Sequence, residues 1–181
     1  MLFLQLAAFV HMPAAHSSTA VRPLAPLTFV LKTHCAAGGC LYTLPGGVEY
    51  PTQAINTASL SPDTIDGLLR EGVKLGITSV DFHLGTEREG VALAVKALGR
   101  SKFFLITKIN PPPANLTNAS AAADLVRQSV ATELSYSALG TDFVDVLLLK
   151  DSPSCAVMQA QWKVVEEMLD TGRARAIGTY N

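Results

Sequence analysis

The 181-residue sequence has little charge: only 16% of its residues are Asp, Glu, Lys or Arg, and its formal net charge is -1. Soluble domains average about 25% charged residues, so few charged side chains are available here to cover an outer surface. Binding to nucleic acid through phosphate neutralisation needs a basic field, which 14 Lys and Arg against 15 Asp and Glu do not provide. The composition therefore argues against a nucleic-acid partner.

Long hydrophobic runs are also lacking. The apolar stretch from Leu2 to Val10 is far shorter than the roughly 18 residues that span a bilayer, so no membrane span is expected. A secretory signal could have an apolar core of this length, but no Lys or Arg precedes it. Glycosylation patterns at Asn115 and Asn118 would fit secretion, although asparagine also caps helices. We expect a cytoplasmic protein, with the secretory pathway as the alternative if residues 1–20 are a signal peptide.

Cysteine is scarce, with three residues in the chain. Cys35 and Cys40 are close together in the sequence, whereas Cys155 is far from both. A structural zinc site needs four ligands at matched spacing, and the sequence offers no such set. We therefore expect three reduced thiols and no metal site.

Apolar residues are abundant, at 49% of the sequence, which is enough to fill a core and excludes disorder. From residue 44 onward, short apolar runs alternate with longer stretches of helical periodicity. The runs predict strands at 53–58, 79–83, 103–109, 144–150 and 176–181, and glycines 76, 99, 140 and 172 end the four intervening helices. Repeated βα units of this kind predict a parallel sheet, either open or curved into a barrel.

Two helix starts are indicated by capping residues. Ser61 precedes Pro62, a residue that suits the first position of a helix. Thr86 and Glu89 have the spacing of a capping box, which predicts that Thr86 is the N-cap of the second helix. The glycine-rich fingerprint of a dinucleotide-binding open sheet is missing after the first predicted strand, which argues against that fold.

Five segments, in order, resemble motifs of the aldo-keto reductases. Residues 44–57 resemble the opening hairpin and first strand of that family, and 76–81, with Glu89 downstream, resemble its second-strand motif. Residues 104–108, 143–149 and 172–181 resemble the third, fourth and fifth strand motifs. The resemblance implies an α/β fold, namely a partial (β/α)8 TIM-type barrel of about five parallel strands and four helices. Residues 1–43 would be an amino-terminal extension, and 44–181 the partial barrel.

Members of that family reduce carbonyl compounds with NADPH, using an aspartate, a tyrosine, a lysine and a histidine at the carboxyl ends of barrel strands. By resemblance, Asp81 and Lys108 occupy the aspartate and lysine positions. Thr86 occupies the tyrosine position and Lys150 the histidine position, so half of the tetrad is replaced. A phenol near pKa 10 can give up a proton beside an ammonium group, but an aliphatic hydroxyl is a far weaker acid. His83, two residues after Asp81, is a possible substitute acid.

The resemblance also assigns residues to the cofactor. Thr57, Asp81 and Asn181 match positions that line the nicotinamide, while the usual serine before the last of these is Tyr180. A complete barrel takes roughly 250 residues, and the loops that hold cofactor phosphates follow its last two strands. We therefore expect a truncated barrel in which the phosphate-binding half is absent.

These observations predict an NADPH-dependent aldo-keto reductase, acting on a small carbonyl substrate, that is weak or inactive as this chain. The alternative is a non-catalytic binding or assembly protein that retains part of a barrel. Strand edges left open in such a sheet would favour self-association.

Overall fold

A computed structural model describes residues 33–36, 39–152 and 154–180 of the chain. The candidate signal peptide and Asn181 lie outside the described residues. Within them, no helix has the length and apolar character that crossing a membrane requires.

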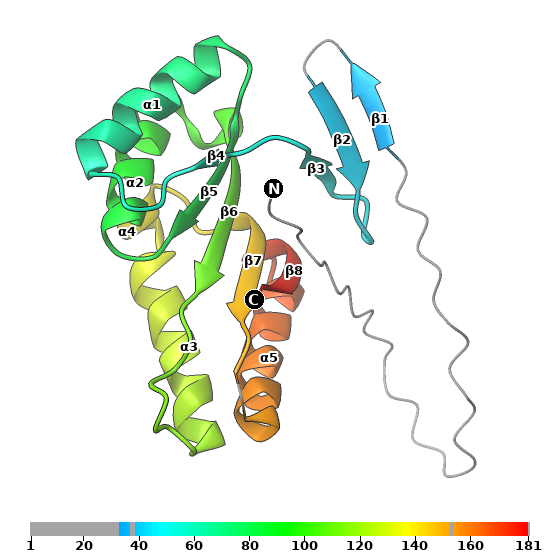
Figure 1. Ribbon diagram of the computed structural model, residues 1–181, viewed down its shortest axis with the longest axis vertical. Helices are drawn as coiled ribbons and strands as arrows, with labels where there is room; N and C mark the ends of the chain where they lie inside the picture. Colours follow the sequence, from blue (N-terminus) through cyan, green and yellow to red (C-terminus); the bar gives the residue numbers. More distant parts are fainter. Residues whose placement is uncertain (1–32, 37–38, 153, 181) are drawn as a thin grey trace.

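A five-stranded parallel sheet forms the centre of the molecule, and its strands are neighbours in the order of the sequence (Figure 1). The strands are β4 (Ile55–Asn56), β5 (Ser79–His83), β6 (Phe104–Ile109), β7 (Val144–Lys150) and β8 (Ala174–Tyr180). All four pairings between neighbours are parallel. The predicted α/β architecture, with consecutive parallel strands joined by helices, is therefore confirmed.

Helices follow the strands and cover one face of the sheet (Figure 1). They are α1 (Pro62–Lys74), α2 (Thr86–Leu98), α3 (Ala119–Glu133), α4 (Tyr136–Leu139) and α5 (Cys155–Asp170), with a short 3-10 helix η1 (Arg100–Lys102) after α2. The helix predicted to run to Gly140 is in fact two helices. Ser135 separates them, because its hydroxyl accepts a hydrogen bond from the backbone N–H of Ala138 at 3.3 Å and so begins α4.

The ends of the helices agree with most of the capping predictions. Ser61 caps α1 and Asn118 caps α3, each accepting a backbone N–H three residues later. The glycines expected to follow the helices, at 76, 99, 140 and 172, all have positive φ, a conformation that favours glycine. The capping box at Thr86 is wrong. Gly85 is the N-cap of α2, and Thr86 is the first helical residue.

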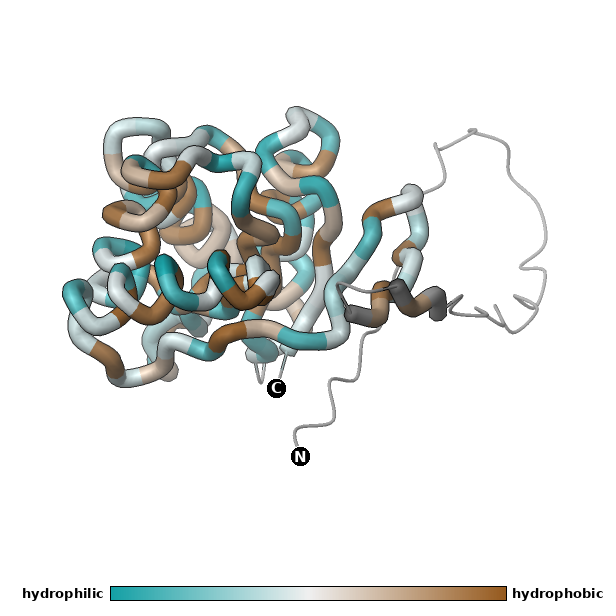
Figure 2. The backbone as a smooth tube through the Cα atoms, turned by 90° about the horizontal axis from the view of Figure 1, so that it is seen from above, coloured by the Kyte–Doolittle hydropathy of each residue, from teal (hydrophilic) through white to brown (hydrophobic). Residues whose placement is uncertain are grey.

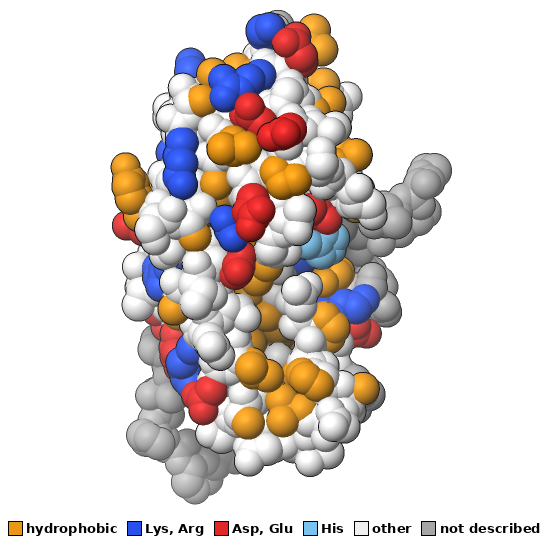
Figure 3. All heavy atoms as spheres, turned by 90° about the vertical axis from the view of Figure 1, so that its left-hand side faces the viewer, with side chains coloured by type: hydrophobic (Ala, Val, Ile, Leu, Met, Phe, Trp, Pro, Cys, Tyr) orange, Lys and Arg blue, Asp and Glu red, His pale blue; other side chains and the backbone are white. Residues whose placement is uncertain are grey.

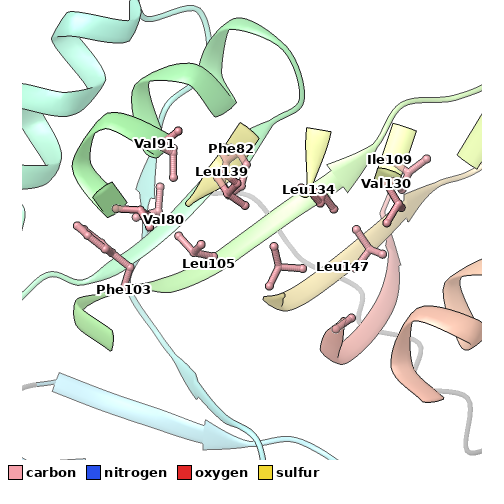
Figure 4. Packing of buried hydrophobic residues seen from close by; sticks show 14 of the residues in the cluster. Val80, Phe82, Val91, Phe103, Leu105, Ile109, Val130, Leu134, Leu139 and Leu147 are labelled. Atoms are coloured by element: carbon pink, nitrogen blue, oxygen red, sulfur yellow. The ribbon is translucent and has the colours of Figure 1, made fainter. Parts of the chain in front are cut away.

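The main hydrophobic core lies between the sheet and the helices (Figure 4). Val80 and Phe82 of β5 and Leu105 of β6 contribute to it from the strands, and Val91 and Val130 from α2 and α3. Figure 2 shows brown and teal alternating along the helices, as expected where each helix has one apolar face. Burial of this face of the sheet explains why its strands were recognisable as apolar runs.

A second, antiparallel sheet contains β1 (Thr33–Ala36), β2 (Gly39–Thr43) and β3 (Glu49–Pro51). Cys35 and Cys40 are opposite each other on β1 and β2 and form a disulfide, so the expectation of reduced thiols is wrong for this pair. Two residues on opposite positions of paired strands are close enough to be bridged, a proximity that spacing in the sequence does not reveal. This sheet begins before residue 44 and therefore spans the predicted domain boundary, which itself stays a prediction.

The loop between β2 and β3, together with Tyr50 of β3, packs against the face of the parallel sheet that the helices leave uncovered. Leu44 and Val48 form a second apolar cluster with strand residues of that face, namely Ile106, Val146, Leu148 and Ala176. We call this face the inner face, because it corresponds to the interior of a barrel. The apolar cluster covers its amino-terminal part, and the carboxyl ends of the strands are left for polar residues.

The helix-covered side of the molecule has no field of one charge. Acidic and basic side chains are interspersed over the face shown in Figure 3. Several of them form ion pairs on or between helices, such as Arg70 with Asp66 at 2.9 Å and Arg88 with Glu133 at 2.9 Å.

Candidate functional site

The carboxyl ends of four neighbouring strands bring polar side chains together on the inner face. Lys108 follows the inner-face residue Ile106 by two positions on β6, and Lys150 follows Leu148 by two positions on β7. Side chains two positions apart on a strand point to the same side, so both lysines belong to the inner face. Tyr180 ends β8 and pairs in register with Lys150. We call Asp81, Lys108, Lys150 and Tyr180 the mouth cluster.

Asp81 and Lys108 form an ion pair within the mouth cluster. Lys108 Nζ donates a hydrogen bond to Asp81 Oδ1, and Asn56 Nδ2 donates to Asp81 Oδ2 at 3.2 Å. The side chains are 9% and 22% exposed for Lys108 and Asp81 respectively, so the pair is largely withdrawn from water yet reachable from the mouth. The structure therefore brings these two residues into direct contact.

Lys150 joins this pair through an aromatic ring. Its Nζ lies 4.9 Å from the centroid of the Tyr180 ring, and Lys108 Nζ lies 5.7 Å from the same centroid. Both distances are within the range of cation–π attraction. Asp151 is 3.6 Å from Lys150 Nζ and more than half exposed. Tyr180 therefore links the two lysines, a contact that the sequence-based prediction did not include.

The surroundings of Tyr180 raise the pKa of its phenol above the usual value. Burial is the main cause, because it disfavours the charged phenolate, and the negative charges of Asp81 and Asp151 add to the effect. The phenol consequently keeps its proton over the neutral range.

Glu87, which sequence analysis did not single out, holds the backbone around the site. Its Oε2 accepts hydrogen bonds from the Thr57 hydroxyl at 2.7 Å and from the His83 N–H at 2.9 Å, and lies 3.3 Å from His83 Nδ1. Its Oε1 accepts a longer bond, 3.4 Å, from the Ser59 N–H. Thr57 N donates in turn to the carbonyl of Asp81 at 3.1 Å. Glu87 thus ties the ends of β4 and β5 to the first turn of α2.

The pKa of Glu87 is lowered from its usual value. Burial alone would raise this pKa, but the hydrogen bonds from His83 and Thr57 stabilise the carboxylate and outweigh it. In the sequence, Glu87 could be recognised only by its position in the first turn of a helix. Its hydrogen-bond partners lie up to 30 positions away, so no local pattern connects them to it.

Thr86 lies apart from these contacts. It is exposed on the first turn of α2, and the described part of the chain gives its hydroxyl no hydrogen-bond partner. His83, the possible substitute acid, is engaged by Glu87 through both its backbone N–H and its Nδ1. His83 pairs in register with Lys108 across β5 and β6, so its backbone lies beside the ion pair while its ring contacts Glu87. The predicted catalytic roles of Thr86 and His83 stay predictions.

The described residues fit a nicotinamide cofactor in part. Thr57 is fully buried and its hydroxyl donates a hydrogen bond to Glu87, so its side chain is not exposed to a cofactor. Asp81 lies at the mouth and is partly exposed, which fits a contact with a cofactor or substrate. Among the described residues, no cluster of three or more His, Cys, Asp or Glu could hold a metal ion.

Solved structures that are similar to the chain in fold include aldo/keto reductases. The chain is similar to an aldo/keto reductase from Brucella melitensis, at 24% identity and a TM-score of 0.63, covering 84% of this chain and 54% of that one. It is also similar to a putative 2,5-diketo-D-gluconic acid reductase B, at 24% identity and a TM-score of 0.61, covering 82% and 48% of the two chains. No family model matches the chain, and no curated protein is significantly similar to it.

A further structure adds a cofactor to this comparison. An aldo/keto reductase from Klebsiella pneumoniae in complex with NADP and acetate has 22% identity and a TM-score of 0.57, covering 75% of this chain and 47% of that one. The chain spans about half the length of these structures. It therefore has the fold of part of an aldo-keto reductase barrel.

Proposed function

We propose that the chain is an aldo-keto reductase by family and that its mouth cluster is a site for NADPH-dependent carbonyl reduction. The observation that carries this proposal is the Asp81–Lys108 ion pair at the carboxyl end of a parallel sheet with this fold. Active sites of such barrels lie at that end. The substrate class is a small aldehyde or ketone.

Each residue of the pair has a separate task in this proposal. Lys108 supplies an ammonium that attracts electron density developing on a carbonyl oxygen, and Asp81 holds that ammonium in place. NADPH, when bound, supplies the hydride. Asp81 is the described residue that fits a contact near the cofactor, and Asn181 stays a prediction.

The proposed activity is weak, because two of the four tetrad positions are changed. A well-placed general acid contributes about 10²–10⁴-fold to such a reaction, and Thr86 cannot replace a phenol in this role. Lys150 adds a second ammonium where the resemblance places an imidazole. The rival function, a non-catalytic binding protein, is favoured by the burial of the Thr57 side chain, whose hydroxyl donates to Glu87.

The two functions are separated by measuring binding and turnover together. NADPH binding is followed by fluorescence titration, and its oxidation is then followed at high protein concentration with a panel of aldehydes. Slow but saturable turnover supports carbonyl reduction, and it should increase by about 10²-fold in a Thr86→Tyr, Lys150→His variant if those positions are the weakness. Binding of NADPH without turnover in either protein would favour the non-catalytic function.

Self-association and the cellular compartment stay predictions. Self-association through the edges of the parallel sheet would appear as a concentration-dependent mass in sedimentation. The cellular compartment needs localisation of the tagged protein.

A further inference from the structure

Four tyrosines are present in the sequence, and the structure describes all of them. Tyr42 and Tyr50 belong to the antiparallel sheet, and the Tyr50 ring packs edge-on against Phe104 at the amino-terminal start of β6, 5.7 Å away. Tyr136 is exposed on α4, on the helix-covered side. Burial and then the charge of Asp81 raise the pKa of Tyr50, so this phenol also faces the Asp81–Lys108 pair. Tyr180 differs from it in lying within cation–π distance of both Lys108 and Lys150.

We propose that Tyr180 is the general acid of this site, replacing the phenol that the chain lacks at position 86. The inference rests on the proposed function, since an acid is needed only if a carbonyl is reduced. It places the proton donor at the end of β8, close to two lysines, instead of at the start of α2.

The geometry around Tyr180 suits this task. Its ring lies 5.7 Å from Lys108 Nζ and 4.9 Å from Lys150 Nζ, measured to the ring centroid. Two ammonium groups beside a phenol stabilise the phenolate that remains after the proton is given up. Within the described part of the chain, the Tyr180 hydroxyl donates no hydrogen bond to another residue, which leaves it available to a substrate oxygen.

The charged groups that face Tyr180 come from three elements. Asp81 is on β5, Lys108 on β6, and Lys150 with Asp151 lies at the end of β7. Burial, and after it the charges of Asp81 and Asp151, raise the pKa of Tyr180, so the acid is present in its protonated form at neutral pH. Loss of activity on the alkaline side should therefore reflect ionisation of this phenol.

The step balances in atoms and electrons. The carbonyl carbon accepts a hydride supplied by NADPH, the C=O π bond breaks, and Tyr180 Oη gives its proton to the oxygen. The products are an alcohol, NADP⁺ and a phenolate, which regains a proton from water. His83 is the competing acid, since Glu87 engages only its Nδ1, at 3.3 Å, and the variants below separate the two.

A Tyr180→Phe variant tests the proposal, with Tyr136→Phe on the helix-covered side as the matched control. We expect Tyr180→Phe to lose about 10²-fold or more in single-turnover rate, with little change in NADPH affinity. The decrease in rate at alkaline pH should also be absent from its pH profile. The control should behave as the unmodified chain. An unchanged rate in Tyr180→Phe would overturn the role of Tyr180 and direct attention to His83.

A second readout needs neither cofactor nor turnover. Tyrosinate absorbance near 295 nm is followed during alkaline titration, and the difference between the unmodified chain and Tyr180→Phe isolates the phenol of Tyr180. Lys150→Met should raise that pKa, because an ammonium beside the phenolate is removed. An unmoved pKa would overturn the proposed contact. No turnover in any variant despite bound NADPH would overturn the proposed function and the acid role together. Turnover by the unmodified chain that Tyr180→Phe retains in full would overturn the acid role alone.

Discussion

Each end of the parallel sheet contains an aspartate paired with cationic side chains, but the two are held differently. At the amino end, Asp145 is 3% exposed and is bonded to Arg100 at 2.6 Å, to Arg175 at 2.7 Å and to the Leu105 N–H at 2.8 Å. At the carboxyl end, Asp81 is 22% exposed and bonded to one lysine and one amide. The Asp145 carboxylate is buried in contacts that stabilise the fold, while the Asp81 carboxylate remains accessible from the mouth.

This difference separates stability from function within one sheet. A buried carboxylate with several charged hydrogen bonds fixes the strands that supply its donors, and its loss leaves those donors unpaired. A carboxylate at the rim can hold a lysine and still meet a ligand. The burial of each aspartate and the number of its bonding partners distinguish the structural carboxylate from the functional one.

The largest expected effect is on stability and comes from the amino end. Asp145→Ala should lower the free energy of unfolding by about 3–5 kcal/mol, because Arg100 and the Leu105 N–H lose their common acceptor. Asp81→Ala should cost less, because its side chain is more exposed and water can replace part of the interaction. Urea unfolding of both variants measures the difference. Equal losses would mean that both aspartates are structural.

A smaller effect is expected at Glu87. Glu87→Gln should lower stability by about 1–3 kcal/mol at pH 7, because a carboxylate that accepts several hydrogen bonds is replaced by a neutral amide. The folded-state pKa of Glu87 is lowered, so its contribution is complete above the unfolded-state pKa and is lost as the pH falls through the folded-state value.

The pH dependence gives this prediction its test. The difference in unfolding free energy between the unmodified chain and Glu87→Gln should shrink as the pH is lowered from 7 to about 3. Thr57→Val removes one of the hydrogen-bond donors to Glu87 and should reproduce part of the loss in unfolding free energy at pH 7. A difference that stays constant with pH would contradict the assigned hydrogen bonds.

The smallest expected effect is a change in titration. Burial and the charge of Asp81 raise the pKa of Tyr180, so Asp81→Asn should lower that pKa by removing the carboxylate. Absorbance near 295 nm during alkaline titration measures it. Asp145→Asn at the other end of the sheet is the comparison, and an equal shift in both variants would show that Asp81 is not the carboxylate that Tyr180 senses.

Much of the fold could be predicted from the sequence because its signals are local. Apolar runs identified β5, β6 and β7, and Ser61 and four glycines marked the ends of helices. The local capping signal at Thr86 failed because the loop before α2 is fixed by distant residues. Gly85 donates to Glu133, which is 48 positions away, and has the positive φ of the observed N-cap.

The site was predictable only where it depends on strand ends. Asp81 and Lys108 each lie at or near the end of an apolar strand, and parallel pairing brings such residues together. The roles of Glu87 and Tyr180 depend on how strands, helix and hydroxyl groups meet in space. Their partners are far away in sequence, so no spacing rule reveals them.

Turnover by lysine variants at opposite ends of the sheet tests the central claim most directly. Lys108 lies in the mouth cluster, whereas Lys102 is exposed on η1 at the amino end. Oxidation of NADPH with an aldehyde is measured at high protein concentration for Lys108→Met and Lys102→Met. The proposed site predicts that Lys108→Met loses about 10²-fold or more in rate and that Lys102→Met keeps the rate of the unmodified chain. Equal rates in the two variants would contradict a reduction site at the carboxyl end of this sheet.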